Sequence, residues 1–349
     1  MKERTKISVA VITYNQESTI RQTLDSILVQ KGDFDLEIII GEDCSTDATH
    51  AICEEYARQW NDGMSRDKSL NEPLSLNDGR RVVRLLPNTH NLGIMGNFAR
   101  VMKACTGEYV GICAGDDYWC DEQKLQKQLT YMKANPQFGV CCTSGYRLMV
   151  ETGRMVPGIE PLNPILSGDV SQFYRDNLSG VYAQPLSLLI RSDMLKFVDF
   201  DEFVRRKFPF EDYPMQSILA HHTLFGYLPD RTSVYRISSK SATFTSFDSP
   251  KYMAYFAGIA DMRRYLHSLF PEDVPFSEEW ATEYVQHKQF LQYAWYGNFN
   301  EAKTLVHQMD DVSDLKKKLS KIVSNRLFFY CFTAYKRYLR FRNYRRRTY

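Results

Sequence analysis

The sequence contains no apolar run of the roughly 18–20 residues that a membrane-spanning helix needs. None of its eight cysteines forms a C-x-x-C pair, so the ligand spacing of a zinc or dithiol site is missing. The N-terminal segment MKERTKISVAVITYN has no signal-peptide h-region before a small-residue cleavage site. We therefore expect a cytoplasmic chain whose cysteines are reduced.

Acidic residues are missing from the C-terminal end of the chain. The 349 residues include 44 Lys and Arg and 42 Asp and Glu, a net charge of +2, yet 12 of the basic residues and no acidic residue follow Asp314. The part before this tail holds 32 basic and 42 acidic residues, a net charge of −10. Such an asymmetry points to an anionic partner for the tail. The acidic body argues against nucleic-acid binding, which needs a basic face.

Short β-branched runs alternate with amphipathic segments in the first half of the chain. The predicted strands are 7–13, 36–41, 81–86, 109–114 and 139–143, and the predicted helices are 17–30, 46–60, 95–104 and 122–134. This alternation with short links predicts a three-layer α/β sandwich whose central sheet is mostly parallel.

The second half is less regular. We predict a hairpin around 151–153, strands at 186–191, 226–228 and 233–237, and a helix at 212–222. After residue 250 the pattern is purely helical, at 251–269, 277–297, 301–308 and 313 to about 342. The polar segment 61–80 is typical of a surface loop. We therefore predict an α/β domain over residues 1–245 and a helical region over 246–349.

Polar side chains follow the predicted strands, where parallel α/β sheets bind ligands. These positions are Thr13-Tyr14-Asn15, Gly41 to Asp47, Gly115-Asp116-Asp117, and Glu211-Asp212 at the start of a later helix. Carboxylates gathered at one edge repel one another unless a cation neutralises them, and oxygen ligands suit Mg²⁺ or Mn²⁺. We expect Asp116-Asp117 to hold a metal that bridges a diphosphate. Asp43 is a candidate acceptor for a hydrogen bond from a base or a ribose hydroxyl.

Each of these features also has a simpler interpretation. Asp47 can be a helix cap, Asp116-Asp117 a solvated turn, and Glu211-Asp212 a pair of acids that favour a helix N-terminus electrostatically. Tyr118 and Trp119 can stack on a sugar face or pack in the core. The combined pattern, with each motif after the correct strand, is more specific than any single part.

The segments VAVITYN, IIIGEDCSTDAT, NLGIMGNFARV and GEYVGICAGDDYWCDEQKLQKQL resemble family 2 glycosyltransferases, closely over residues 5–145 and more loosely to about 240. The resemblance implies the Rossmann-like GT-A fold. It also implies inverting, metal-dependent transfer of a sugar from a nucleotide-diphosphate sugar, with a UDP-sugar favoured, and Mg²⁺ or Mn²⁺ as the cofactor. The implied acceptor is a hydroxyl of a glycan or a lipid-linked sugar in surface-polysaccharide biosynthesis.

The resemblance also implies roles for individual residues. The nucleotide-sugar site would include Thr13, Tyr14, Asn15, Glu17, Asp43, Ser45, Asn91, Gly93, Asn97, Asp116 and Arg236. Asp117, with Asp116, would hold the metal, and Asp212, with Glu211 beside it, would be the general base.

Some positions depart from the family pattern. Glu42 stands where Asp is commoner, and Cys44 replaces the usual Gly, although a side chain is less comfortable in left-handed backbone. The Q/R-x-x-R-W signature of processive synthases is missing after Asp212, and a His that often adds a metal ligand is missing after Arg236. A nucleotidyltransferase is the alternative enzyme, but the segment 14–17 is not a Gly-rich, basic phosphate loop. A degenerate sugar-nucleotide-binding module is the non-enzymatic alternative, which the intact acid set disfavours.

The C-terminal segment RLFFYCFTAYKRYLRFRNYRRRTY mixes aromatic and basic residues. On a helix this composition is typical of an interfacial segment at an anionic membrane, and it predicts peripheral binding at the inner face. The alternatives are a packing helix whose charged end is solvated and an RNA-binding tail.

Overall fold

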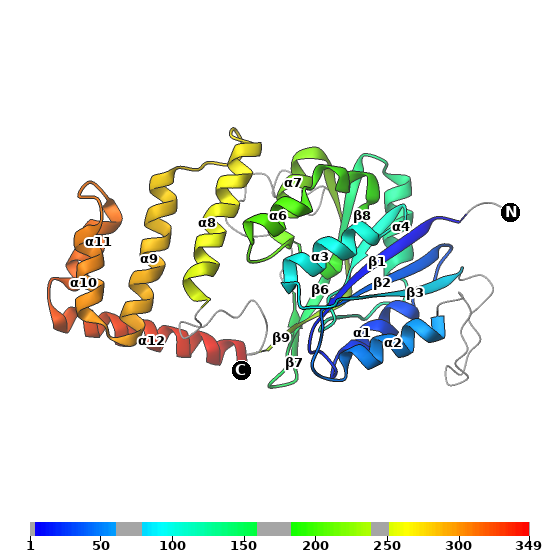
Figure 1. The fold of residues 1–349 in the computed structure, drawn as a ribbon, viewed down its shortest axis with the longest axis horizontal. Helices are drawn as coiled ribbons and strands as arrows, with labels where there is room; N and C mark the ends of the chain where they lie inside the picture. The colour runs from blue at the N-terminus through cyan, green and yellow to red at the C-terminus, as the bar shows by residue number, and fades with distance from the viewer. Residues whose placement is uncertain (1–3, 61–78, 159–182, 239–250, 349) are drawn as a thin grey trace. The chain divides into compact units, whose positions relative to one another are not determined.

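The computed structural model describes residues 4–60, 79–158, 183–238 and 251–348 (Figure 1). Contacts divide the chain into two compact units, Met1–Leu148 with Met155–Ile237, and Met149–Arg154 with Ser238–Tyr349. The predicted domain boundary at 245/246 and most of the predicted loop 61–80 lie outside the described residues.

A nine-stranded sheet forms the first unit, in the order β3-β2-β1-β4-β8-β6-β9-β5, with β7 paired to β6. The strands are β1 (Lys6–Thr13), β2 (Asp35–Glu42), β3 (Arg81–Pro87), β4 (Tyr109–Ile112), β5 (Tyr118–Trp119), β6 (Phe138–Met149), β7 (Arg154–Pro157), β8 (Leu189–Arg191) and β9 (Leu224–Ile237). Strands β1 to β4 pair in parallel, whereas β8 pairs antiparallel with β4 and β6, and β5 with β9. The α/β class is confirmed, but the sheet is mixed, because the regular strand–helix–strand units end after β4.

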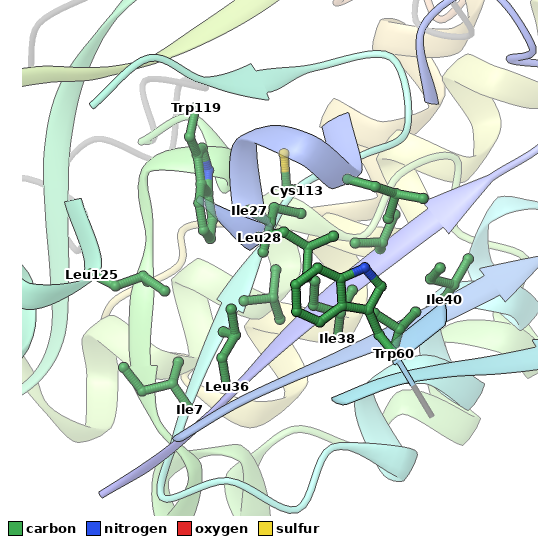
Figure 2. Close-up of a cluster of buried hydrophobic side chains, with 14 of the residues drawn as sticks. Ile7, Ile27, Leu28, Leu36, Ile38, Ile40, Trp60, Cys113, Trp119 and Leu125 are labelled. Atoms are coloured by element: carbon green, nitrogen blue, oxygen red, sulfur yellow. The ribbon is translucent and has the colours of Figure 1, made fainter. Parts of the chain in front are cut away.

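Helices cover both faces of the parallel strands. The helices of this unit are α1 (Ile20–Leu28), α2 (Thr49–Trp60), α3 (Gly93–Ala104), α4 (Lys124–Ala134), α6 (Phe200–Arg206) and α7 (Asp212–His222), with short 3₁₀ turns η2 (Pro185–Ser187) and η3 (Ser192–Phe197). Figure 2 shows alternate residues of β1 and β2, including Ile7, Leu36, Ile38 and Ile40, packed with Ile27 of α1. Their neighbours in the strands face α3, where a Cβ at Gly41 would touch Val101. Burial on both faces explains the continuous apolar runs of these strands.

The second unit is helical, with α8 (Tyr252–Leu269), α9 (Glu278–Tyr296), α10 (Phe299–Gln308), α11 (Asp314–Val323) and α12 (Arg326–Thr348). A second apolar cluster centred on Phe290 and Phe329 joins α9 to α12. Within the described ranges, no helix is both long enough and apolar enough to cross a membrane.

Several predicted elements differ in extent from those of the structure. The strands predicted at 226–228 and 233–237 are one strand, β9. The helix predicted from 313 to about 342 is two helices, α11 and α12. It breaks because the Asn325 side chain accepts a hydrogen bond from the Leu327 N–H (2.7 Å), a capping interaction that starts a new helix.

One buried carboxylate ties β1, β2 and β3 together at the end of the sheet opposite the predicted site. Glu37 accepts hydrogen bonds from Lys6 (2.8 Å), Arg84 (2.7 Å), Thr106 (2.7 Å) and Ser8 (3.0 Å). Burial by itself would raise the pKa of Glu37, but these four donors outweigh burial and lower the pKa to about 2.

We predict that this carboxylate makes the stability of the first unit pH-dependent. Because the folded-state pKa lies below the unfolded value, the stabilisation is complete above about pH 5 and is lost as the pH falls toward about 2. Glu37→Gln should cost about 2–3 kcal/mol at pH 7, and the cost should shrink on acidification. Urea unfolding of both proteins at pH 7 and pH 3 measures it. Glu55→Gln, at the exposed pair with Arg21 (2.6 Å), is the control. A cost that is the same at both pH values would contradict the prediction.

Candidate functional site

The carboxyl ends of β1, β2 and β4 bring three of the polar motifs side by side. In the parallel register Thr13 pairs with Glu42, at the last residues of β1 and β2. Backbone hydrogen bonds continue beyond the strands, from Asp43 N to Thr13 O (3.1 Å) and from Gly115 N to Ile12 O (2.9 Å). The loops that carry Asn15, Asp43 and Asp116 therefore start from one sheet edge.

Arg236, near the end of β9, closes onto the Asp116-Asp117 loop. Its backbone N–H donates to Asp117 Oδ1 (2.8 Å), and its Nη1 donates to the Asp116 carbonyl oxygen (2.5 Å). The guanidinium also donates to the Gln22 side chain and lies 4.6 Å from the ring centroid of Tyr118. The antiparallel pairing of β5 with β9 places Arg236 there. One arginine thus joins β9 to the acidic loop and to α1.

Asp117 is buried and the neighbouring Asp116 is half-buried, and both carboxylates have elevated pKa values. Burial raises the pKa of Asp116, although the Arg236 charge and the Gln16 side chain act in the opposite direction. Burial raises the pKa of Asp117 well above its usual range, and the Asp116 charge raises it further. Two carboxylates in so dry a place favour a nearby cation.

The donor set is suited to a hard divalent ion but incomplete. In the part of the chain that the structure describes, no three His, Cys, Asp or Glu side chains come together as metal ligands. Two adjacent carboxylates fit Mg²⁺ or Mn²⁺ when phosphate oxygens and water complete the coordination, which is how such ions are commonly held beside nucleotides.

Three residues that the sequence analysis missed support this loop. Thr13 Oγ1 donates to Gln16 Oε1 (2.8 Å), and Gln16 in turn hydrogen-bonds Asp116. The hydroxyls of Thr19 and Thr23 donate to the Gly115 carbonyl oxygen (2.8 and 3.0 Å), and Thr23 also donates to the Asp117 carbonyl oxygen (2.6 Å). These bonds anchor the acidic loop on α1.

The sequence contains a pattern that indicates the role of Thr19 and Thr23. Thr19, Thr23 and Ser26 recur at helical spacing beside the apolar positions of α1, and Ser26 Oγ accepts the Trp119 N–H (3.0 Å). A line of small hydroxyl residues on a buried helix face indicates that the helix bonds to backbone groups of a neighbouring loop. The Trp119 side chain itself is buried, and its Nε1 donates to the Leu186 carbonyl oxygen (2.9 Å), so it packs in the core.

Gly115 allows the loop to approach β1 closely. A Cβ at this position would lie 2.4 Å from Gln16 Oε1 and 2.7 Å from Thr13 Oγ1. Only glycine fits between these two side chains.

The loop after β1 is joined to the loop after β2 by a set of side-chain hydrogen bonds. The Asn15 N–H donates to Ser45 Oγ (3.0 Å), and Asn15 Oδ1 accepts the Thr46 N–H (2.8 Å). Glu17 Oε2 accepts the Ala48 N–H (2.9 Å) close to the start of α2. Asn15, Glu17 and Ser45 are thus brought together, and their side chains shape the loops. The neighbouring Tyr14 is exposed.

Asp47 caps the start of α2, which is the simpler of the two interpretations given for it above. Its Oδ1 accepts the Thr49 N–H (2.9 Å), and its Oδ2 accepts the Glu17 N–H (3.1 Å). The first bond satisfies a backbone donor at the start of α2, and the second satisfies one in the loop between β1 and α1.

Asp43 is buried and oriented by the loop that follows β3. Its Oδ1 accepts hydrogen bonds from Asn88 Nδ2 (2.7 Å) and from the Leu92 N–H (2.8 Å). The Asn88 amide orientation is set by Arg100, a donor-only group, which bonds Asn88 Oδ1. Asn91 Nδ2 donates to the Asp43 carbonyl oxygen (3.0 Å). The loop thus holds one carboxylate oxygen of Asp43 in place.

Gly93 and Asn97 lie on the same loop–helix segment but in different surroundings. Gly93 begins α3 with a φ of +73°, and its N–H donates to Asn91 Oδ1 (3.0 Å). Asn97 is buried under β2, where its Nδ2 donates to the Gly41 carbonyl oxygen (2.7 Å). These contacts make Asn97 a support for β2.

Glu211 and Asp212 stand at the start of α7, on a different element. The Tyr213 N–H donates to Asp212 Oδ1 (2.8 Å), and both acids are half-buried. Burial raises the pKa of Glu211, and the Asp212 charge raises it further. The hydrogen bonds described for the sheet edge join most of the other predicted positions, whereas Glu211 and Asp212 come from α7.

A family and several relatives match this chain. The chain belongs to the glycosyl transferase family 2, whose sequence model matches residues 8–196. Uncharacterized protein Rv1520 of Mycobacterium tuberculosis strain H37Rv is 35% identical over 157 residues, which are 45% of this chain and 40% of that protein. The putative teichuronic acid biosynthesis glycosyltransferase TuaG of Bacillus subtilis strain 168 is 28% identical over 186 residues, 53% of this chain and 61% of that protein. The matches thus span less than two thirds of these curated relatives.

Among solved structures, residues 1–349 of S. aureus TarS in complex with UDP-GlcNAc are similar to this chain, with a TM-score of 0.53. The sequence identity is 17%, and the match covers 95% of this chain and 92% of that one. At this identity the likeness establishes a shared fold, which is the GT-A fold expected from the sequence.

Backbone strain at Cys44 yields a prediction. Cys44 has a φ of +64°, in the left-handed region that costs a residue with a Cβ roughly 1–2 kcal/mol. Relief of this strain by Cys44→Gly should raise the free energy of unfolding. The gain should be only about 0.5–1 kcal/mol, because glycine also gains entropy in the unfolded chain, which opposes it. Chemical denaturation measures the change.

Two variants serve as controls for this prediction. Lys207→Gly, at the C-cap of α6 with a φ of +54°, should show a similar gain, whereas Cys44→Ala should show none. A loss of stability in Cys44→Gly would contradict the assignment of strain.

Proposed function

We propose that this chain transfers a sugar from a nucleoside-diphosphate sugar to an acceptor hydroxyl. The observation that carries the proposal is the adjacent pair of Asp116 and the buried Asp117 after β4, held by Arg236 beside the Asp43 loop. Membership of the glycosyl transferase family 2 and the nucleotide-sugar complex of TarS support the same chemistry.

For the donor we favour a UDP-sugar, bound across the ends of β1, β2 and β4. Two protein donors share Asp43 Oδ1, so we assign the contact with the base to its Oδ2. Thr13, Tyr14 and Asn15 would line the nucleotide pocket. Arg236 would bind the diphosphate, because a guanidinium donates in a fork that matches phosphate oxygens.

Asp117, with Asp116, would hold Mg²⁺ or Mn²⁺. Such an ion stabilises the negative charge that develops on a departing nucleoside diphosphate. The protein's own part is to present two carboxylates from a loop that Thr19, Thr23 and Arg236 keep rigid.

The reaction would be a single displacement with inversion. The acceptor oxygen bonds to the anomeric carbon, the bond from that carbon to the diphosphate oxygen breaks, and the hydroxyl proton passes to a carboxylate. We assign this general-base role to Asp212. Glu211, whose pKa is raised by burial and by Asp212, would remain protonated beside it, so that the pair carries one charge.

The acceptor class we favour is a glycan or a lipid-linked sugar of a surface polysaccharide. The name of TuaG supports that setting, as does the basic tail of this chain. We place the reaction in the cytoplasm, at the inner face of a membrane, with residues 1–245 as the transferase domain and 246–349 as the helical region.

We predict that Asp117→Asn removes the effect of metal on donor binding. In the parent protein, Mn²⁺ should increase the thermal stabilisation by a UDP-sugar, and the variant should show roughly tenfold weaker metal-dependent binding. Without ligands the variant should melt no lower than the parent, because a neutral amide relieves the burial of a charge. Asp121→Asn, at the ion pair with Lys127 (2.7 Å), is the matched control. Equal Mn²⁺ titrations of variant and parent would remove Asp117 from the metal site.

We predict that Asp212→Asn abolishes transfer without loss of donor binding. Removal of a general base typically costs about 10²- to 10⁴-fold in rate, whereas the base does not contact the nucleotide. Initial rates with UDP-, GDP- and dTDP-sugars and an acceptor panel, together with donor affinity by thermal shift, measure both effects. Asp201→Asn on α6 serves as the control. Full activity of Asp212→Asn would exclude the assigned role.

A further inference from the structure

Over residues 326–339, one side of α12 carries no charged residue. This side, which we call the α12 outer face, consists of Leu327, Phe328, Cys331, Ala334, Tyr335 and Tyr338. All six are exposed; Leu327 is 68% and Phe328 62% exposed. None of them is charged, so the outer face is an apolar and aromatic stripe in contact with solvent.

The opposite side of α12 is fixed by packing inside the second unit. Phe329 is fully buried, with its ring centroid 6.3 Å from Phe290 of α9 and 5.4 Å from Phe299 of α10. Thr333, one turn later, is also buried. Figure 1 shows α12 crossing the C-terminal end of α9. The outer face therefore points away from the core of its own unit.

Basic residues of α12 flank the outer face. Arg326 lies 5.3 Å from the Phe299 ring centroid, and Lys336 lies 5.4 Å from that of Phe332. Arg337 Nε donates to the Trp295 carbonyl oxygen (3.1 Å), near the C-terminus of α9, where a cation is favourable. The basic residues in this part of the tail thus stabilise the helix packing as well as adding positive charge.

A second set of positive charges lies on α11. Lys317, Lys318 and Lys321 are exposed at helical spacing, on the side opposite the buried Leu319 and Val323. Together with the residues of α12, they belong to the 12 basic residues that follow the last acidic residue of the chain.

We propose that the α12 outer face docks on an anionic lipid bilayer. Leucine, phenylalanine and tyrosine side chains would enter the interfacial layer, and the surrounding lysines and arginines would be attracted to the headgroups. The positive charge of this part of the chain favours an anionic bilayer over a second copy of the chain. A second copy of the chain would bring two strongly basic tails together and repel, whereas anionic lipid supplies both an apolar layer and the opposite charge. The proposal rests on the proposed function in one respect only: docking on the bilayer would bring the chain close to a lipid-linked acceptor.

The test is co-sedimentation of the full chain with vesicles, without donor or acceptor. The chain should bind vesicles that contain phosphatidylglycerol, and far less to pure phosphatidylcholine. Leu327→Ser with Phe328→Ser should weaken binding by about tenfold or more, because two large apolar side chains leave the interface. The matched control is Val150→Ser with Met155→Ser, which removes exposed apolar side chains elsewhere and should bind like the parent.

A charge variant tests the contribution of the lysines on α11. Lys317→Gln, Lys318→Gln and Lys321→Gln combined should weaken binding to anionic vesicles and reduce its dependence on salt. Arg58→Gln, Lys133→Gln and Lys196→Gln combined remove three exposed charges from the first unit and should have little effect. Circular dichroism verifies that each variant is folded. These substitutions are sharper than removal of residues 336–349, which would also delete the contact of Arg337 with α9.

Several outcomes would overturn the proposal. They are equal binding to neutral and anionic vesicles, no binding to either, or unchanged binding by the Leu327 and Phe328 variant. A fourth is a dimer, seen by light scattering, that the same variant dissociates, because then a second copy covers the face. Donor binding is measured separately, so a chain that binds a UDP-sugar but not vesicles would contradict only this inference.

Discussion

Two neighbouring carboxylates, the half-buried Asp116 and the buried Asp117, lie at the end of a strand, and the rest of the site depends on compensating their charge. Burial and mutual repulsion raise the pKa of Asp117, so the surrounding chain supplies donors and positive charge. Arg236 arrives from β9 to bond both residues, and threonine hydroxyls of α1 hold the loop carbonyls. The antiparallel half of the sheet is thus part of the candidate site, because it delivers the one arginine seen to contact this loop among the described residues. Under the proposed function, a loop held in this way would be preorganised for a cation and a diphosphate.

The parallel half of the fold and the loops at its edge could be predicted from sequence because their signals are local. A strand buried on both faces must be continuously apolar, as β1 and β2 are, and the polar residues that follow such strands must meet at one edge. The mixed character of the sheet could not be predicted in this way. Pairing partners of β6, β8 and β9 are distant in sequence, and β9 has a polar middle that divided it into two predicted strands. Gln16 and Gln22 were missed for a related reason, since each acquires its role from a residue that only the fold brings near.

In the C-terminal region, the packing of α12 shows which of its residues are exposed, which the composition of the segment alone does not. The sequence of α12 reads as a mixture of aromatic and basic residues, and helical spacing alone does not tell which side of the helix is buried. The break at Asn325 sets a new helix in which Phe329 is buried, and that packing decides which residues point outward. The resulting apolar stripe, with cations beside it, is a more specific feature than the net charge of the tail. The Asp116-Asp117 pair and this stripe lie in different units of the chain, so each has to be tested independently.

The central claim is that the Asp116-Asp117 pair completes a metal site only with a nucleoside diphosphate. Calorimetric titration of Mn²⁺ into the parent protein, with and without saturating UDP, tests this most directly. The account predicts that UDP tightens Mn²⁺ binding, and that Mn²⁺ tightens UDP binding by the same factor, because the two ligands share one site. Mn²⁺ and UDP affinities that are independent of each other would contradict it.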